Sequence, residues 1–334
     1  MPRLHFEDFI PGTSQIYGSH EVSEESIIAF AREYDPQPFH VDPEAAKDTF
    51  VGTLIGSGWH SCSINMRLIS DGFLLDTAAM GAPGIEEVRW LKPMLPGDVL
   101  CSRVTVMETR TSQSRPELGL VRFGLELIDQ SDKAVLTQTN WILIARRGAP
   151  PPTPLRPPQE TSPAGEDVEP ADPQPSNLFF EDIQTGVTQD LGAYHFSAER
   201  IVGFAREFDP QRFHVDPDAA RESLFGGLCA SGWQTAAGWM NRMCAHRNRV
   251  AQGARARGER VARLGSSPGF KNLRWLKPVY AGDTIRYRST FTDKRRSGSR
   301  PGWGLAFHHN TGTNQRGEEV FSFDGVVFWE ARDG

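Results

Sequence analysis

The stretch Phe30–Ala46 reads FAREYDPQPFHVDPEAA, and Phe204–Ala220 reads FAREFDPQRFHVDPDAA. Fourteen of the seventeen aligned positions are identical, at an offset of 174 residues. Around this stretch the two copies differ more, because across residues 6–66 and 180–240 only 15 of the other 44 positions match. A period of this length indicates one fold used twice, unlike the 20–50-residue period of a solenoid. The sequence therefore predicts two related domains within 334 residues.

Residues 148–177 separate the two copies and hold ten prolines, with Leu155 and Val168 as their only large aliphatic residues. Such a composition cannot bury a core and is typical of an extended, semi-rigid linker. We therefore predict an N-terminal domain over residues 1–147 and a C-terminal domain over residues 178–334. The linker itself is compatible with two paired domains and with two independent ones.

The first copy shows the start and end signals of several elements. Ser23–Tyr34 has the spacing of a helix with Ser23 as its cap. The helix should end before the run Asp35–Pro38, because a residue before proline avoids the α region. Asp42, followed by Pro43, predicts a second short helix. A longer apolar helix should begin at Gly58, and alternation within Val121–Ala145 predicts an antiparallel hairpin.

Each copy carries an acid and an imidazole five residues apart, as Asp35 with His40 and as Asp209 with His214. A carboxylate and a neutral imidazole can hold one water, with His taking its proton and Asp orienting it or handling the second proton. This chemistry suits the addition of water to a carbon–carbon double bond, or its reversal. Asp before proline is also a common turn residue, and His could serve packing alone. Survival of the pair in both copies favours the catalytic interpretation.

Gly58 and Gly232 each lie eighteen residues after the histidine of their copy, within a shared Ser-Gly-Trp sequence that opens the apolar helix. A backbone N–H at a helix start is well suited to stabilise an enolate oxygen. The sequence thus supplies a candidate oxyanion donor beside each acid–imidazole pair. A glycine chosen for close packing remains the alternative.

The order of D-P-Q-P-F-H, then VDPEAA, then S-G-W at a helix start resembles the (R)-specific enoyl-CoA hydratases of the MaoC-like dehydratase family. The resemblance covers residues 6–146 and 180–331. It implies an α+β fold of two hot-dog domains, each an antiparallel sheet wrapped around a long central helix. It also implies that the two domains pair as a pseudo-dimer, so we favour a fused dimer over two independent domains.

The resemblance further implies a hydro-lyase that adds water reversibly and syn to a trans-2-enoyl-CoA, giving an (R)-3-hydroxyacyl-CoA. The matching catalytic positions are Asp35, His40 and Gly58 in the first copy and Asp209, His214 and Gly232 in the second. It implies no metal and no redox cofactor, coenzyme A being part of the substrate. A hot-dog thioesterase and a non-catalytic acyl-thioester-binding protein are the alternative functions.

Two departures from the family pattern concern the sites. Arg212 replaces the proline found at Pro38 in the first copy, so we expect the second site to be less preorganised and the first to be the stronger. Relatives place a serine further along the central helix to support the acid, and here Met66 and Met240 occupy that position by spacing. We expect this difference to affect substrate or rate more than reaction class.

The offset between the copies changes from 174 to 185, which places an eleven-residue insertion within about residues 242–269. Residues 242–263 hold seven arginines against one acid, Glu259. Guanidinium groups bind phosphate well, so a lid that contacts the phosphates of coenzyme A is one interpretation. The candidate contacts are Arg247, Arg249, Arg255 and Arg257. A solvated basic surface is the other interpretation.

Composition narrows the class of partner. A net charge of −6 argues against nucleic-acid binding. No run of about 18 apolar residues indicates a membrane span, and the N-terminus has no signal-peptide pattern. The four cysteines lack C-x-x-C spacing and do not repeat between the copies, which argues against a metal or disulfide framework. We expect a cytoplasmic protein that acts on an acyl-CoA thioester, as a monomeric pseudo-dimer or a higher homo-oligomer.

Overall fold

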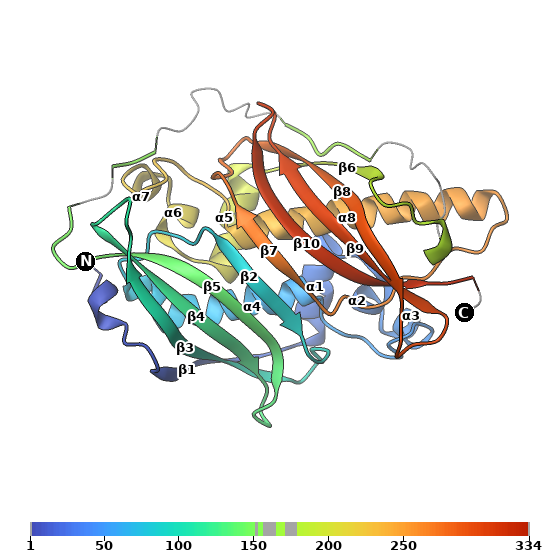
Figure 1. Ribbon diagram of the computed structural model, residues 1–334, viewed down its shortest axis with the longest axis horizontal. Coiled ribbons are helices and arrows are strands. Elements are labelled where there is room, and N and C mark those ends of the chain that lie inside the picture. Colours follow the sequence, from blue (N-terminus) through green and yellow to red (C-terminus); the bar gives the residue numbers. More distant parts are fainter. Residues whose placement is uncertain (1, 151–152, 156–164, 171–178, 333–334) are drawn as a thin grey trace.

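The computed structural model describes residues 2–150, 153–155, 165–170 and 179–332. Ten antiparallel strands form one continuous sheet in the order β1-β3-β4-β5-β2-β7-β10-β9-β8-β6 (Figure 1). The strands of the first half are β1 (Ser14–Glu21), β2 (Gly84–Trp90), β3 (Val99–Thr111), β4 (Leu118–Ile128) and β5 (Ala134–Ala145). Those of the second half are β6 (Thr188–His195), β7 (Gly269–Trp275), β8 (Thr284–Arg296), β9 (Trp303–Thr313) and β10 (Glu319–Glu330).

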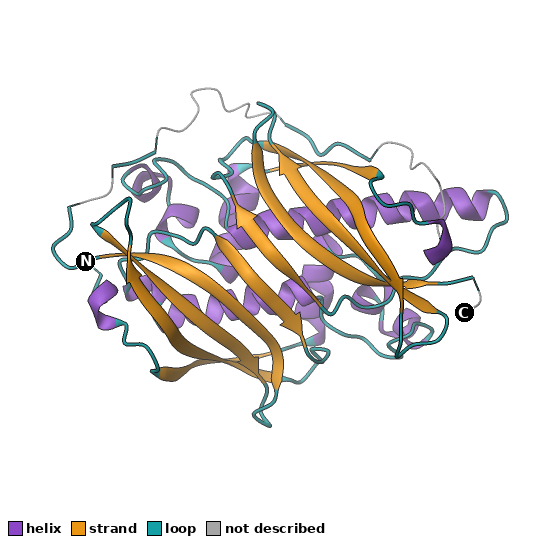
Figure 2. Cartoon of the chain, viewed as in Figure 1, coloured by secondary structure: helices purple, strands orange, loops and turns teal. Residues whose placement is uncertain are grey.

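The helices lie on one face of this sheet (Figure 2). In the first half they are α1 (Glu24–Tyr34), α2 (Pro38–Val41), α3 (Pro43–Lys47) and α4 (Gly58–Gly72). Their counterparts are α5 (Ala198–Phe208), α6 (Arg212–Val215), α7 (Pro217–Arg221) and α8 (Gly232–Ala256). Three short 3-10 turns complete the described elements, at Phe6–Asp8, Leu74–Asp76 and Phe180–Asp182. In each half the sheet curves around one long helix, α4 or α8, which is the predicted hot-dog arrangement.

Local sequence signals explain most element boundaries. Ser23 caps α1 by accepting a hydrogen bond from the Ser26 amide at 3.0 Å, and the helix ends at Tyr34, directly before the Asp-Pro run as predicted. Asp42 caps α3 in the expected way, with Oδ1 accepting from the Glu44 amide at 2.9 Å. The short helix α2 was not predicted. Pro38 at its first turn suits a helix start and places His40 within one turn of helix.

The two halves join through the pairing of β2 with β7, which makes two sheets into one. Gly84 and Gly269 stand at the two ends of this ladder, with φ of 159° and 144°. A Cβ atom on Gly84 would lie 2.0 Å from the Leu273 carbonyl oxygen, and one on Gly269 would lie 2.1 Å from that of Val88. Glycine at both positions therefore permits the close approach of the two strands.

The helices also cross between the halves. The Phe30 ring of α1 contacts Phe208 of α5 at 5.6 Å, and Tyr34 contacts Phe204 at 5.7 Å, both edge to face. These four residues belong to one buried cluster that runs through both halves. Edge-to-face pairs add to the free energy gained by burial. The shared core shows that the halves form a pseudo-dimer and not two separate domains.

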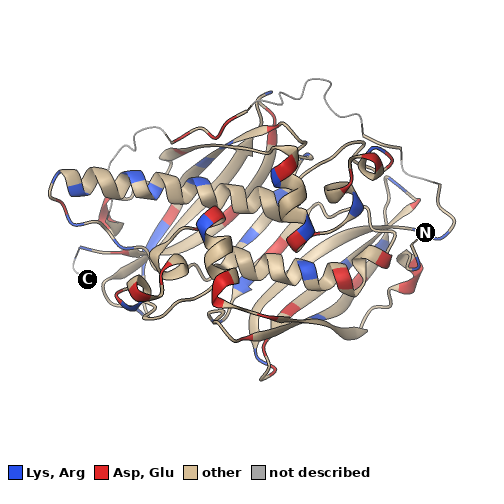
Figure 3. Cartoon of the chain, turned by 180° about the vertical axis from the view of Figure 1, so that it is seen from behind, with Lys and Arg blue, Asp and Glu red and all other residues tan. Residues whose placement is uncertain are grey.

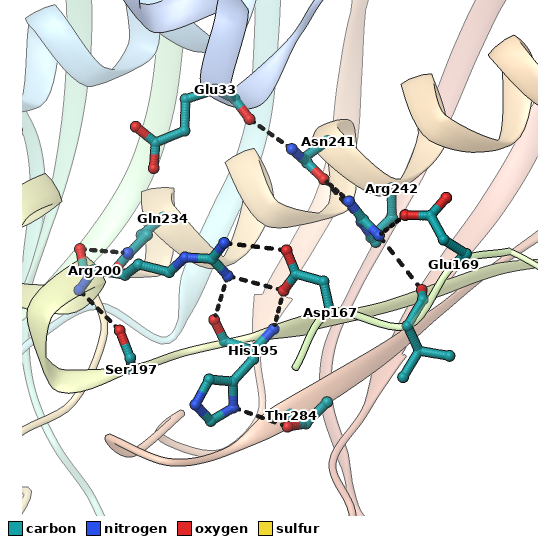
Figure 4. A network of polar contacts seen from close by, with 11 residues as sticks. Glu33, Asp167, Glu169, His195, Ser197, Arg200, Gln234, Asn241, Arg242 and Thr284 are labelled. Atoms are coloured by element: carbon teal, nitrogen blue, oxygen red, sulfur yellow. Dashed lines mark hydrogen bonds and ion pairs between the residues drawn. The ribbon is translucent and has the colours of Figure 1, made fainter. Parts of the chain in front are cut away.

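Part of the linker is bound to the second half (Figure 4). Val168 exchanges two backbone hydrogen bonds of 2.8 Å with Ala193 of β6. Beside it, Asp167 makes an ion pair with Arg200 of α5 at 2.8 Å, and Glu169 makes one with Arg242 of α8 at 3.3 Å. Residues 167–169 of the predicted linker are therefore fastened along the sheet edge, and residues 151–152, 156–164 and 171–177 lie outside the described ranges.

No helix within the described ranges combines the length and apolar character that a membrane span requires.

Candidate active site

Each half brings its predicted acid and imidazole together. Asp35 is the C-terminal cap of α1 and His40 lies on α2, which places His40 Nε2 3.4 Å from Asp35 Oδ2. In the second half the same atoms of His214 and Asp209 are 3.5 Å apart. All four side chains are buried. A separation of this size is long for a direct hydrogen bond, and it leaves both groups available to a third polar atom.

The surroundings of each histidine determine its tautomer. His40 Nδ1 lies 2.7 Å from the Ile55 carbonyl oxygen, and His214 Nδ1 lies 2.7 Å from that of Cys229. A carbonyl oxygen can only accept, so Nδ1 must carry the proton in each case. In the neutral ring Nε2 then keeps its lone pair, on the side that faces the aspartate. Each imidazole is thus oriented to act as a base through Nε2.

Each aspartate is held by two further side chains that the sequence analysis did not identify. Ser57 Oγ donates to Asp35 Oδ2 at 2.6 Å, and Gln37 Nε2 donates to Oδ1 at 2.8 Å. The second half repeats both contacts on Asp209, from Ser231 at 2.7 Å and Gln211 at 2.9 Å. These serines are the caps of α4 and α8. Repetition of Gln and Ser within the shared motifs was the signal that could have revealed them.

These contacts also show where support for the acid comes from. Met66 and Met240 occupy the position of the serine that supports the acid in relatives, and they do not provide this support. Met66 instead contributes to the wall of a cavity, and Met240 packs against the main core cluster. The acid is therefore supported from the helix cap.

Gly58 and Gly232 are the first residues of the two central helices. The amide of a first helical residue has no partner within the helix, so it can donate to a ligand. A Cβ atom on Gly58 would lie 2.5 Å from the ring of Trp90, and one on Gly232 would lie 2.2 Å from that of Trp275. The indole of Trp275 also donates to the Gly232 carbonyl at 3.0 Å. The glycines thus serve close packing and leave an amide available.

A cavity of about 260 Å³ reaches the second site. Its lining includes Asp209, His214, Gly232 and Trp233 from the second half. The opposite wall comes from the first half and is mainly apolar, comprising Met66, Ile69, Leu74, Met80, Ile85, Ile142 and Leu143. Leu155 of the linker contributes to the same cavity and bonds through its amide to the Leu224 carbonyl at 2.7 Å. The second site is therefore built by both halves together.

Neither Asp35 nor His40 lines this cavity. Beside them, the ring of Trp59 stacks on Phe270 at 4.9 Å and meets Phe323 at 5.8 Å and Trp239 at 6.0 Å.

We call Trp239, Phe270 and Phe323 the aromatic plug. The strand offset of 185 and the helix offset of 174 pair them with Asn65, Ile85 and Gln138 of the first half. At these positions the second half places bulky rings around Trp59, whereas Ile85 and Gln138 of the first half line the cavity that reaches the second site.

A cysteine distinguishes the two acids further. Cys244 of α8 donates its thiol to Asp35 Oδ1 at 3.4 Å. Burial, with the nearby Asp35 charge, raises the pKa of this thiol well above its ordinary value, so it stays protonated and able to donate. The matching residue of the first half is Ser70, a buried hydroxyl with no hydrogen-bond partner among the described residues. Asp35 therefore has one more donor than Asp209.

The arginine-rich segment forms the last turns of α8 and the loop behind it, at the end of the molecule near the C-terminus (Figure 3). Arg247 places its guanidinium 4.2 Å above the Trp329 ring, and burial of that group lowers its pKa to about 10. Arg257 pairs with Glu259 at 2.7 Å. Arg249 is partly buried and Arg255 is exposed. The four residues proposed to contact coenzyme A do not line the cavity at the second site.

Two other arginines of the segment, Arg260 and Arg263, pair with the buried Glu330 at 2.7 and 2.6 Å. They fasten the loop after α8 to the last strand. Within the described ranges, no group of three or more His, Cys, Asp or Glu side chains is arranged to hold a metal ion.

Comparison with known proteins agrees with this architecture. The chain is 33% identical over 144 residues to the uncharacterised protein YdeM of Bacillus subtilis, which covers 43% of this chain and all of YdeM. It is 29% identical over 249 residues to the mesaconyl-CoA hydratase of Cereibacter sphaeroides, covering 68% of this chain and 67% of that protein.

Among solved structures, a putative MaoC domain dehydratase from Chloroflexus aurantiacus matches with a TM-score of 0.74 at 18% identity, covering 98% of this chain and 97% of that one. A conserved protein of Mycobacterium tuberculosis with a double hotdog fold matches with a TM-score of 0.67 at 15% identity, covering 97% and 98%. The sequence pattern of the MaoC like domain matches residues 10–124 and 181–301. With this match over both halves, the chain belongs to the MaoC-like dehydratase family.

Proposed function

We propose that the protein adds water reversibly to the double bond of a trans-2-enoyl-CoA thioester and forms an (R)-3-hydroxyacyl-CoA at the Asp209–His214 site. The observation that carries the proposal is a cavity lined by this acid–base pair and by Gly232, the first residue of α8. Family membership supports a hydratase or dehydratase, and a relative that covers two thirds of the chain is a mesaconyl-CoA hydratase.

In the proposed reaction, a water lies between Asp209 Oδ2 and His214 Nε2, which are 3.5 Å apart. His214 accepts a proton from the water while its oxygen bonds to C3 of the substrate. The electron pair of the double bond moves toward the thioester, whose oxygen gains negative charge and accepts from the Gly232 amide. A proton is then delivered to C2 from the same face, through the Asp209–His214 pair, so that addition is syn and the enzyme groups return to their starting state.

The preceding contacts preorganise each group for its role. The Nδ1–H bond to Cys229 fixes the tautomer of the neutral His214 ring, so the Nε2 lone pair is directed at the water. Ser231 and Gln211 donate to the two oxygens of Asp209 and so fix the orientation of this carboxylate. General acid–base catalysis of this kind contributes about 10²–10⁴-fold to a rate.

We assign the reaction to the second site because of the cavity and the aromatic plug, although the first copy keeps the family's proline and we had expected it to be the stronger. Asp35 and His40 have nearly the same geometry, but Trp59 is enclosed by the rings of the plug. The first half then contributes the wall that receives the acyl chain, while the second contributes the reacting groups.

Among the described residues that line the cavity, Lys277 is the one with a cationic side chain. It is half exposed and paired with Glu318 at 2.5 Å. We propose that it assists in binding the phosphates of coenzyme A at this side of the molecule. The four arginines considered from the sequence are less suited, because none of them lines this cavity.

The test is a hydration assay on trans-2-enoyl-CoA thioesters of several chain lengths, with the release of free thiol followed in parallel. Loss of the enoyl absorbance without thiol release, with an (R)-3-hydroxy product, is the expected result. Release of thiol would indicate a thioesterase instead. Binding of the thioesters with neither reaction would indicate a non-catalytic binding protein.

A further inference from the structure

Two amide side chains interrupt the apolar wall of the cavity. Gln138 and Asn140 stand two residues apart on β5, so both point to the same face of the sheet. They are 4% and 3% exposed, and both line the cavity that reaches His214. Their neighbours on that face, Leu136 and Ile142, are apolar. The amides are thus the polar part of an otherwise hydrophobic surface.

The hydrogen bonds of these amides are incomplete. Gln138 Nε2 donates to Asn140 Oδ1 at 3.0 Å. Gln138 Oε1 is buried and has no hydrogen-bond partner among the described residues. Asn140 Nδ2 likewise donates to no acceptor among the described residues. Exchanging the N and O atoms of both amides would reverse the bond between them and again leave one acceptor and one donor unused. In either orientation the wall offers an acceptor and a donor side by side.

The fold does not require polar residues at these positions. In the second half, β10 matches β5 at an offset of 185, so Phe323 and Gly325 occupy the corresponding places. That half folds with the same sheet and no amide at either position. Burying an unpaired amide is unfavourable, because the group gives up its hydrogen bonds to water. The amides of the first half are therefore best explained by what occupies the cavity.

We propose that the cavity recognises an enoyl-CoA thioester whose acyl chain carries an uncharged hydrogen-bonding group, such as a hydroxyl, and that Gln138 and Asn140 determine this specificity. That the ligand is an enoyl-CoA thioester rests on the function proposed above. A hydroxyl can donate to the free carbonyl oxygen and accept from the free amide nitrogen at once, which satisfies both.

The other lining residues limit the class of substrate further. A carboxylate at the same place would lose its water among mainly apolar side chains, and Lys277, the one cation among the described lining residues, is assigned above to the phosphates of coenzyme A. The volume of about 260 Å³ lies just below the ~300–1,000 Å³ common for ligand pockets. The acyl chain is therefore expected to be short.

The experiment compares saturated thioesters, which bind but cannot be hydrated. Titration calorimetry would measure Kd for butyryl-CoA and hexanoyl-CoA. It would also measure Kd for 4-hydroxybutyryl-CoA, for 6-hydroxyhexanoyl-CoA and for the dicarboxylic analogues of both chains. At least one hydroxylated ligand should bind about tenfold or more tightly than its unsubstituted parent and than its carboxylate analogue. In Gln138→Met, which keeps the volume and removes the polar atoms, this preference should disappear, with a thermal melt to confirm folding.

The proposal would be overturned if no hydroxylated ligand bound more tightly than its parent in the wild-type protein, as would occur if ordered water satisfied the amides. Tighter binding of a carboxylate would overturn the claim of an uncharged group. A preference that persisted in Gln138→Met and in Asn140→Leu would remove these residues as its cause. If the hydroxylated ligand is preferred while no enoyl thioester is hydrated, the proposed reaction fails and the binding specificity stands.

Discussion

The asymmetry between the two sites leads to a sharp prediction for Asp209→Asn and Asp35→Asn. Both aspartates are 3% exposed, both accept from one serine and one glutamine, and both lie near a histidine at almost equal distance. The two substitutions therefore disturb closely similar hydrogen-bond networks, which differ by the Cys244 thiol that donates to Asp35. Because this extra donor makes Asp35→Asn the more disruptive change locally, a larger loss of turnover in Asp209→Asn must come from the environment of the pair.

At the second site, the asparagine cannot accept or return a proton, so the full contribution of acid–base catalysis is lost. We expect kcat to fall by about 10²–10⁴-fold, which corresponds to about 3–5 kcal/mol in the activation barrier at 1.36 kcal/mol per tenfold change. The first site is proposed to take no part in the reaction, because the aromatic plug packs around its Trp59. The kcat of Asp35→Asn should therefore change less than about twofold, within the ordinary variation for a residue remote from the reaction.

The assay measures initial hydration rates for wild type and both variants on the best enoyl-CoA of the panel. Urea denaturation checks that both variants lose stability to a similar extent, because each loses charge-assisted hydrogen bonds worth about 1.5–3 kcal/mol. Equal losses of kcat in the two variants would refute the assignment of the reaction to one site. A larger loss in Asp35→Asn would reverse it.

Other substitutions test the packing around the two sites and the protonation of a buried histidine. Gly232→Ala should lower kcat at least about tenfold, because its Cβ would displace Trp275 beside the oxyanion amide. Gly58→Ala also crowds an indole, and it should reduce stability with kcat nearly unchanged. Kinetics paired with thermal melts distinguish the two outcomes. Phe323→Ala should destabilise the protein by about 3–5 kcal/mol, because it removes the ring at the centre of the plug. Urea denaturation measures this loss, and a value below about 1 kcal/mol would mean that the rings are not closely packed. Burial lowers the pKa of His308, stacked on Trp239 of the plug, to about 4. The unfolded chain then binds more protons at this residue between pH 6.5 and 4, so His308 should contribute a loss of stability on acidification of up to about 1.4 kcal/mol per pH unit in that window. Burial also lowers the pKa of His60 and of His246 to about 3, and both add to the slope. His308→Phe should therefore reduce the slope by the share of one histidine, and an unchanged slope would contradict the assignment.

Much of the site was predictable because its parts are local in sequence. The Asp-Pro-Gln run ends α1 and positions the acid, the helix after it carries the histidine, and Ser-Gly-Trp opens the central helix. Each of these features depends on contacts within a few residues. The supporting roles of Ser57 and Gln37 were missed because they depend on how those segments fold against one another.

The arginine-rich segment shows the limit of composition as a guide. Its charge density suggested phosphate binding, yet Arg260 and Arg263 engage the buried Glu330, and Arg247 stacks on Trp329. Glu330 and Trp329 lie some 70 to 80 residues further along the chain than the arginines that contact them. Only the tertiary structure shows that these cations are used within the protein.

By itself, the sequence determined that one fold occurs twice, that each copy holds an acid–imidazole pair and that a glycine opens each central helix. Repeats, caps and turns are local properties, and they can be recognised in a linear chain. Only the tertiary structure decided that Asp209 and His214 reach the cavity of about 260 Å³, because much of the wall of this cavity comes from the other half. Ile85 and Gln138 line it, whereas Phe270 and Phe323, at the matching positions of the second half, pack against Trp59. That difference has no meaning until the two halves are packed together.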